Sequence, residues 1–280
     1  MRRLPLPSND PSTVFLACVD RVRDHDLRAR LQSVQPHIAF VSASYREAAD
    51  LRQFHTIPSE GNVNGVVTTD EMSDVYKFRM ARKHSAGRHI YDSLMAASPL
   101  GRCPLCGQGT VSTLDHYLPR THFPSLAVTP ANLIPACKDC NHAKGEIYPL
   151  HENEQTLHPY FDDVEDEAWL FAEVIQQSPA TLRFYVQPPV LWNPVLANRV
   201  TRHFNIFGLA KTYGSYAGEE IAIIRHNLQG IYVTGGANQV RAHLTERFES
   251  ALAVHINSWH TASYRALAES AWFCDGGFDT

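Results

Sequence analysis

The chain has 280 residues, of which 44% are hydrophobic and 19% are charged, and its formal net charge is −4. This length suits about two domains, or one domain with additions, and the composition is that of an ordinary globular protein. No apolar run reaches the ~18 residues of a membrane span, and the N-terminal MRRLPLPSNDPSTVF lacks the apolar segment of a secretory signal. We therefore expect a cytoplasmic protein with no membrane partner.

The region before residue 99 is predicted to be mostly helical. Apolar residues recur with helical spacing over 14–34 and 41–54, and residues 55–69 read as a loop rich in Gly, Asn and Pro. Thr69 or Asp70 is expected to cap a helix over 70–84, and a further helix is expected over 88–98. The 70–84 helix carries a basic run that is either a solvated face or a track for DNA, with three candidate nucleic-acid contacts: Arg79, Arg82 and Lys83.

The central region, 99–160, contains four of the six cysteines in two C-x-x-C pairs, Cys103 with Cys106 and Cys137 with Cys140. Two such pairs supply the four thiolates that Zn²⁺ takes in a tetrahedral structural site. A redox pair or a fortuitous set is the alternative, and it requires two pairs to coincide around a polar insert. Cys18 and Cys274 lie in apolar surroundings and are expected to be buried thiols.

The insert between the cysteine pairs has a pattern of its own. Asp115 and His116 end an expected strand, Asn132 precedes the short apolar strand LIPAC, and Asn141 and His142 open an expected helix. The predicted order is therefore strand, loop, strand and helix. A carboxylate and an imidazole stand at the first strand, and an amide stands at the helix.

The region after residue 160 is expected to begin with a strand hairpin, EAWLFAEVIQQ and TLRFYVQ, followed by helices. Asn193 with Pro194 marks a helix start, and helical patterns follow at about 216–228, 237–257 and 260–272. Residues 146–280 carry 8 Lys and Arg against 16 Asp and Glu, whereas residues 1–102 carry 14 against 11. A polyanion is therefore expected to approach the N-terminal side.

The central stretch resembles the HNH endonucleases, the zinc-containing branch of the ββα-metal nucleases. Their pattern is C-x-x-C, D-H-x-x-P, N-L-x-x-x-C-x-x-C-[HN] and K-G, and nine or ten of its positions are matched here in register. The resemblance implies an α+β fold, in which a small ββα-metal core with a four-cysteine zinc site is embedded between mostly helical regions at 1–98 and 161–280. The flanks look like stand-alone HNH proteins of anti-phage systems, including the nuclease subunits of Septu-like and retron loci.

The resemblance also implies a role for each matched residue. His116 is the general base, Asp115 and Asn141 bind a catalytic Mg²⁺ or Mn²⁺, and Asn132 braces the loop that aims His116. Asn141 directly follows the last cysteine, which makes this an H-N-N variant. His142, rotated by ~100° around the helix, is the alternative ligand. Lys144 is either a phosphate contact or a solvated helix residue, and His158 is a further candidate to approach the site.

Two classes of function remain open from the sequence. The first is a metal-dependent endonuclease that cuts nucleic acid, with double-stranded DNA favoured over RNA or a DNA junction. The second is a non-catalytic zinc module that binds nucleic acid or a protein. An intact set of Asp115, His116 and Asn141 favours the enzyme, because a scaffold needs only the cysteines. Analogy with the defence systems adds an ATPase or another defence protein as an expected partner.

Overall fold

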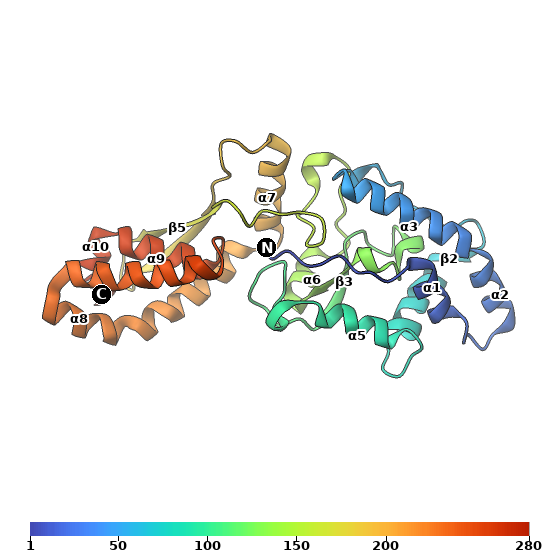
Figure 1. Cartoon of the computed structure of the whole chain (residues 1–280), viewed down its shortest axis with the longest axis horizontal. Helices are drawn as coiled ribbons and strands as arrows, with labels where there is room; N and C mark the ends of the chain where they lie inside the picture. The colour runs from blue at the N-terminus through green and yellow to red at the C-terminus, as the bar shows by residue number, and fades with distance from the viewer. Residues whose placement is uncertain (280) are drawn as a thin grey trace. The chain divides into compact units, whose positions relative to one another are not determined.

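The computed structural model describes residues 1–279, which fall into two compact units, Met1–Asp162 and the part from Asp163 onward. Figure 1 shows the course of the chain through both units. The segments 1–98 and 99–160, which the sequence separates, lie together in the first unit. Apart from its first two residues, the segment from 161 onward forms the second unit. Both units mix helices with small sheets, so the expected α+β class is confirmed.

The first unit begins with three helices, α1 (Pro11–Val19), α2 (His25–Ser33) and α3 (Gln35–Asp50). The single helix expected over 14–34 is therefore wrong. The first helix ends at Val19, and a second helix begins after Asp24. The Asp24 carboxylate accepts the amides of Asp26 and Leu27 at 3.0 Å and so caps the second helix. The short helix η1 (Phe54–Thr56) and the hairpin of β1 (Asn62–Val63) and β2 (Val67–Thr68) follow α3.

The helix expected over 70–84 is α4 (Thr69–Asp74), which continues as the π-helix η2 (Val75–Ala81). The expected cap, Thr69 or Asp70, is wrong, because the residue that caps this helix is Thr68. The Thr68 hydroxyl accepts the Glu71 amide and the Glu71 carboxylate accepts the Thr68 amide, which completes a capping box. Helix α5 (Arg88–Ala96) follows Gly87, where an added Cβ would lie 2.7 Å from Cys18 Sγ and 3.0 Å from the Arg79 carbonyl oxygen. The glycine therefore allows α5 to start against α1 and the π-helix.

The centre of the first unit is a ββα arrangement. Strand β3 (Thr113–His116) pairs antiparallel with β4 (Leu133–Ala136), so that Asp115 faces Ile134 and His116 faces Leu133. Helix α6 (Lys138–Lys144) follows β4 directly, so the expected order of strand, loop, strand and helix is confirmed. The expected helix start at Asn141 is wrong, because the helix already begins after Cys137, whose Sγ accepts the Cys140 amide as a cap. Four short 3-10 helices complete this region: η3 (Pro99–Gly101), η4 (Pro124–Leu126), η5 (Pro130–Asn132) and η6 (Glu152–Glu154).

One hydrophobic core joins the N-terminal helices to this centre. Its buried members come from α1, α2, α3, the π-helix and α5, and they include Leu114 of β3 and Leu133 of β4. The thiol of Cys18 is part of this core, and Cys274 is buried in the second unit, as expected for both. The two central strands are short, so the helices supply most of the apolar surface against which they are held.

The second unit contains β5 (Leu170–Ile175) and β6 (Thr181–Val186), which pair antiparallel as the hairpin that the sequence predicts. Helix α7 (Pro194–Ile206) is capped by Asn193, whose Oδ1 accepts the Leu196 amide at 2.8 Å. The long helix α8 (Leu209–Val254) is interrupted at Gly236, whose φ of 63° is left-handed. In Figure 1 the ribbon of α8 reverses its direction within its length. Helices α9 (Trp259–Glu269) and α10 (Ala271–Cys274) and the short η7 (Gly277–Asp279) follow, and α9 contacts β5 while α8 contacts β6.

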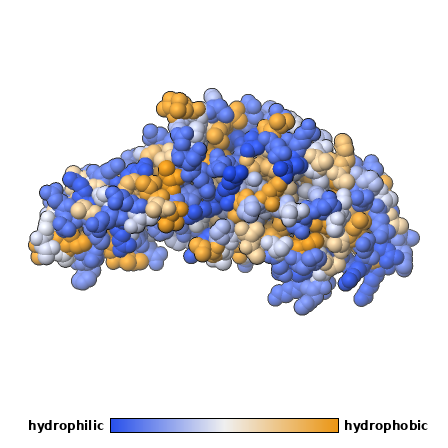
Figure 2. Space-filling view, viewed as in Figure 1, coloured by the Kyte–Doolittle hydropathy of each residue, from blue (hydrophilic) through white to orange (hydrophobic). Residues whose placement is uncertain are grey.

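Within residues 1–279, no helix is both long enough and apolar enough to cross a bilayer. Figure 2 shows hydrophobic side chains in separate groups among hydrophilic ones on the face that it presents. Single exposed hydrophobic side chains are normal on globular proteins.

Candidate functional site

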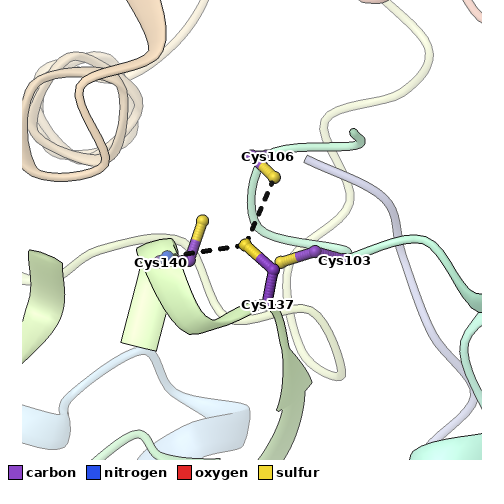
Figure 3. A group of neighbouring side chains, drawn as sticks. All are labelled: Cys103, Cys106, Cys137 and Cys140. Carbon is purple, nitrogen blue, oxygen red and sulfur yellow. Dashed lines mark hydrogen bonds between the residues drawn. The ribbon is translucent and has the colours of Figure 1, made fainter. Parts of the chain in front are cut away.

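The four cysteines of the two C-x-x-C pairs meet in space. Their sulfur atoms all lie within 4.8 Å of one another, and all four residues are buried. Figure 3 shows Cys103 and Cys106 on one loop, with Cys137 at the end of β4 and Cys140 on α6. A group of four thiolates at this spacing can hold a metal ion, and it ties the loop before β3 to the start of α6.

Local backbone geometry prepares both halves of this cluster. The Gly109 amide donates to Cys106 Sγ at 3.3 Å, and the Cys140 amide donates to Cys137 Sγ at 3.5 Å. An added Cβ at Gly109 would lie 2.6 Å from Cys137 Sγ, so only glycine lets the first loop approach the second pair this closely. Amides that donate to sulfur stabilise the thiolate form that binds metal.

The end of β3 carries Asp115 and His116, which are both buried. His116 Nε2 lies 2.8 Å from the Ala127 carbonyl oxygen. A carbonyl only accepts hydrogen bonds, so Nε2 carries the proton and Nδ1 of the neutral ring is a free base. Burial, aided by the nearby Arg120 charge, lowers the pKa of His116 to about 3, which keeps the ring neutral at pH 7.

Asp115 has one oxygen that the protein satisfies only weakly and one that it does not satisfy at all. Oδ1 lies 3.8 Å from Lys144 Nζ, while Oδ2 is buried and has no hydrogen-bond partner in the described part of the chain. Burial raises the pKa of Asp115 to about 6, although Lys144 opposes this shift. A buried carboxylate oxygen with no partner is costly, and a bound cation would remove that cost. Asp115 therefore fits a metal ligand.

Asp115, His116 and Asn141 line one pocket of about 380 Å³. The Asn141 amide nitrogen donates to Thr113 Oγ1 at 3.4 Å, which leaves its carbonyl oxygen available as a ligand. His142, the next residue, is exposed and is not among the residues that line this pocket. A carboxylate and a neutral amide oxygen at one site suit a hard divalent cation such as Mg²⁺.

Asn132 is fully buried, and its side chain contacts the loop that follows His116. Its Oδ1 accepts the Leu118 amide at 2.8 Å, and its Nδ2 donates to the carbonyl oxygens of Leu118 at 3.0 Å and Leu126 at 3.3 Å. One side chain thereby joins the two ends of the loop that follows His116. Ala127, which accepts the His116 hydrogen bond, lies at the far end of that loop.

Lys144 occupies a different place from the one that the sequence suggests. Its side chain is buried, and Nζ donates to the His116 carbonyl oxygen at 2.6 Å. A phosphate contact and a solvated face are both wrong for this residue, because the ammonium lies inside the protein between α6 and β3. Burial lowers the pKa of Lys144, while Asp115 opposes the shift. Lys144 therefore connects α6 to the end of β3 that carries Asp115 and His116.

The remaining candidates lie apart from the pocket. Arg79 and Arg82 line a separate pocket of about 610 Å³ with Phe78, and Lys83 is exposed beside them. His158 is fully buried, its Nε2 is hydrogen-bonded to the Tyr45 hydroxyl at 3.0 Å, and its ring stacks on Phe54. It belongs to an aromatic core, so the idea that His158 approaches the site is wrong.

Arg120 and Tyr76 are among the pocket residues that the sequence analysis did not single out. Arg120 directly follows the D-H-x-x-P stretch, so its position next to the motif was an available signal. Tyr76 also lines the pocket, but it comes from the π-helix some forty residues upstream, where only an apolar helical pattern is visible. Nothing in the local sequence of Tyr76 indicates a role at the site.

Comparison with known proteins agrees with this geometry. Residues 103–146 match the family model described as HNH endonuclease. The chain is 27% identical over 296 residues to "Protein ea31" of Escherichia phage lambda, in an alignment that covers 99% of this chain and 100% of that protein. No solved structure matches the chain significantly.

Proposed function

Because residues 103–146 form an HNH endonuclease domain, we propose that the chain is a metal-dependent endonuclease that hydrolyses phosphodiester bonds, with double-stranded DNA as the favoured substrate. One observation carries the proposal. Asp115 with its unpartnered oxygen, the neutral base His116 and the amide of Asn141 all line one pocket. A scaffold that only bound zinc would have no need to bring these three groups into one pocket.

In the proposed reaction His116 is the general base. Its Nδ1 takes a proton from a water molecule as the water oxygen bonds to phosphorus and the bond from phosphorus to the 3′ oxygen breaks. The departing 3′ oxygen takes a proton from solvent, and the imidazolium later releases its proton. The Ala127 carbonyl keeps the ring oriented through Nε2, and Asn132 keeps the loop that carries Ala127 in place.

Two different metals are proposed for the two ligand sets. Asp115 and Asn141 would hold a Mg²⁺ or Mn²⁺ ion, which supplies positive charge for the phosphate and the leaving oxygen. The four cysteines would hold a structural Zn²⁺, because soft thiolates select zinc over magnesium. The cysteine cluster is separate from the pocket lining, so substitution of His116 or Asn141 should leave the zinc content unchanged.

The test is the incubation of purified protein with supercoiled plasmid, and in parallel with single-stranded RNA and a four-way DNA junction, across a series of Mg²⁺ and Mn²⁺ concentrations. We expect plasmid nicking that His116→Ala abolishes. His89→Ala, which removes an exposed histidine of the same unit, should cut normally. Binding of plasmid without cutting at any metal concentration would instead favour the non-catalytic zinc module.

A metal titration of two neighbouring variants tests the assignment of the helix ligand. Asn141→Ala should raise the Mg²⁺ concentration that cleavage needs and lower the rate by orders of magnitude. His142→Ala should have little effect, because His142 is exposed and outside the pocket lining. The reverse result would make His142 the ligand and tilt the site toward softer ions.

A cytoplasmic role in antiviral defence with an ATPase partner is a further part of the proposal. It rests on the resemblance of the flanking regions to stand-alone nucleases of defence systems. Unregulated cutting by the isolated chain, together with no ATPase recovered in a pull-down from the native host, would count against it.

A further inference from the structure

The pocket contains a cation that neither the metal ligands nor the base uses. Arg120 lines the pocket at the start of the loop after β3, next to Pro119. Within the described residues it forms no ion pair, and its buried Nε has no hydrogen-bond partner. A buried guanidinium nitrogen without an acceptor is costly unless a ligand satisfies it.

An aromatic ring from outside the matched family segment holds this arginine. The Arg120 guanidinium carbon lies 5.2 Å from the centre of the Tyr76 ring. The same ring meets His116 edge-on, with the ring centres 4.5 Å apart at 70°. The Tyr76 hydroxyl donates to the Leu114 carbonyl oxygen at 3.1 Å. Tyr76 therefore contacts the arginine, the base and the strand that carries the base.

The charges around the pocket leave a place for an anion beside Arg120. Asp115 and Glu146 line the pocket as well, but Lys144 Nζ lies 3.8 Å from Asp115 Oδ1, so the two carboxylates would only partly balance a divalent cation bound there. Arg120 then remains as the group that faces a phosphodiester. A guanidinium offers a planar pair of N–H donors, is always charged and binds phosphate oxygens in a fixed orientation.

We propose that Arg120 is a catalytic residue that donates hydrogen bonds to a nonbridging oxygen of the scissile phosphate, and that Tyr76 positions both Arg120 and His116. This inference rests on the proposed nuclease activity. Negative charge grows on the nonbridging oxygens as water attacks, so a donor fixed in advance stabilises the transition state more than the bound substrate. The N-terminal helical region thereby contributes to the active site of the HNH domain.

The experiment compares kcat and KM for duplex nicking by wild type, Arg120→Ala, Arg120→Lys and Arg21→Ala. Removal of one such donor typically lowers kcat by about 10²–10³-fold, and KM should change little. Lysine should restore only part of the rate, because it is a point charge without the planar fork. Arg21→Ala removes an exposed arginine of the same unit and should match wild type. Substrate with sulfur at one nonbridging oxygen should slow wild type but slow Arg120→Ala much less.

A second set of variants tests the role of Tyr76 as a positioning residue. Tyr76→Leu should lower kcat, while Tyr76→Phe, which keeps the ring, should retain most of it. The double variant Arg120→Ala with Tyr76→Leu should lose less rate than the product of the two single losses, because part of the Tyr76→Leu loss passes through Arg120. A purely structural tyrosine would instead give losses that multiply.

The outcomes separate this inference from the proposed function. If wild type cuts, His116→Ala is inactive and Arg120→Ala keeps kcat within threefold, the inference is overturned and the nuclease assignment stands. Loss of bound zinc or of thermal stability in Arg120→Ala would make the arginine structural and would also overturn it. If wild type cuts no nucleic acid under any metal condition, the proposed function itself fails.

Discussion

Replacement of Asn132 should show how much one buried side-chain amide contributes to the stability of the loop that follows His116. Asn132→Ala removes three hydrogen bonds of 2.8, 3.0 and 3.3 Å. The Leu126 carbonyl oxygen keeps the Thr129 amide as a partner, so the Leu118 amide and carbonyl bear most of the loss. An unsatisfied buried polar group costs about 1–3 kcal/mol, which gives an expected destabilisation of roughly 2–4 kcal/mol.

Asn132→Asp distinguishes the donors of the amide from its acceptor. The aspartate keeps an oxygen for the Leu118 amide, but at pH 7 it places a buried carboxylate against the carbonyl oxygens of Leu118 and Leu126. It should therefore be at least as destabilising as alanine at pH 7. It should recover partly at low pH, where the protonated acid can donate one hydrogen bond.

The assay combines urea unfolding with hydrogen exchange of peptides that contain Leu118. The local probe is needed because the chain has two compact units that need not unfold together. The Leu118 amide should exchange faster in both variants. Asn141→Ala, which changes a half-buried asparagine of the same domain, should leave this exchange unchanged. An Asn132→Asp protein as stable as wild type at pH 7, with Leu118 still protected, would refute the hydrogen-bond reasoning.

Three other perturbations have equally direct outcomes. Cys137→Ser should lose zinc and unfold residues 100–150, because the free energy of metal binding at such a site stabilises the fold. Metal analysis checks this, and a well-folded wild type without zinc would refute it. Glu71→Gln should cost about 1 kcal/mol at pH 7 through the lost ion pair with Arg30, because glutamine can still accept the Thr68 amide in the capping box. The hydrogen bond from Arg30 lowers the pKa of Glu71 to about 2, so its contribution is present above pH ~4.5 and disappears as the pH falls toward 2, which thermal melts at both pH values would show. Charge reversal of the basic run, which consists of Arg79, Arg82 and Lys83, should weaken DNA binding. It should also flatten the salt dependence of the binding constant by about one counterion per lost phosphate contact. An unchanged salt slope would make the run a solvated face.

The sequence by itself determined the four-cysteine cluster of the centre and much of its local structure. The spacing of the cysteine pairs predicted a four-thiolate cluster, and the D-H, N and C-x-x-C-N stretches predicted the ββα order that the structure has. The cysteine cluster is not local, but four ligands of one metal ion must lie close together, so their presence predicts which segments meet. The strand and helix order depends on local sequence. The hairpin of β5 and β6 and the Asn193 cap were predictable for the same reason, because turn and cap chemistry act over a few residues.

Only the tertiary structure decided which side chains surround Asp115 and His116. Lys144 was expected at the surface because lysine is almost never buried, yet the His116 carbonyl and Asp115 hold it inside. Tyr76 reaches the pocket from the π-helix and holds Arg120, although nothing in its own segment distinguishes it from a core tyrosine. Helical periodicity tells which face of a segment is buried, but it does not tell what lies against that face. That depends on contacts between segments far apart in the chain, and packing of the whole unit sets them.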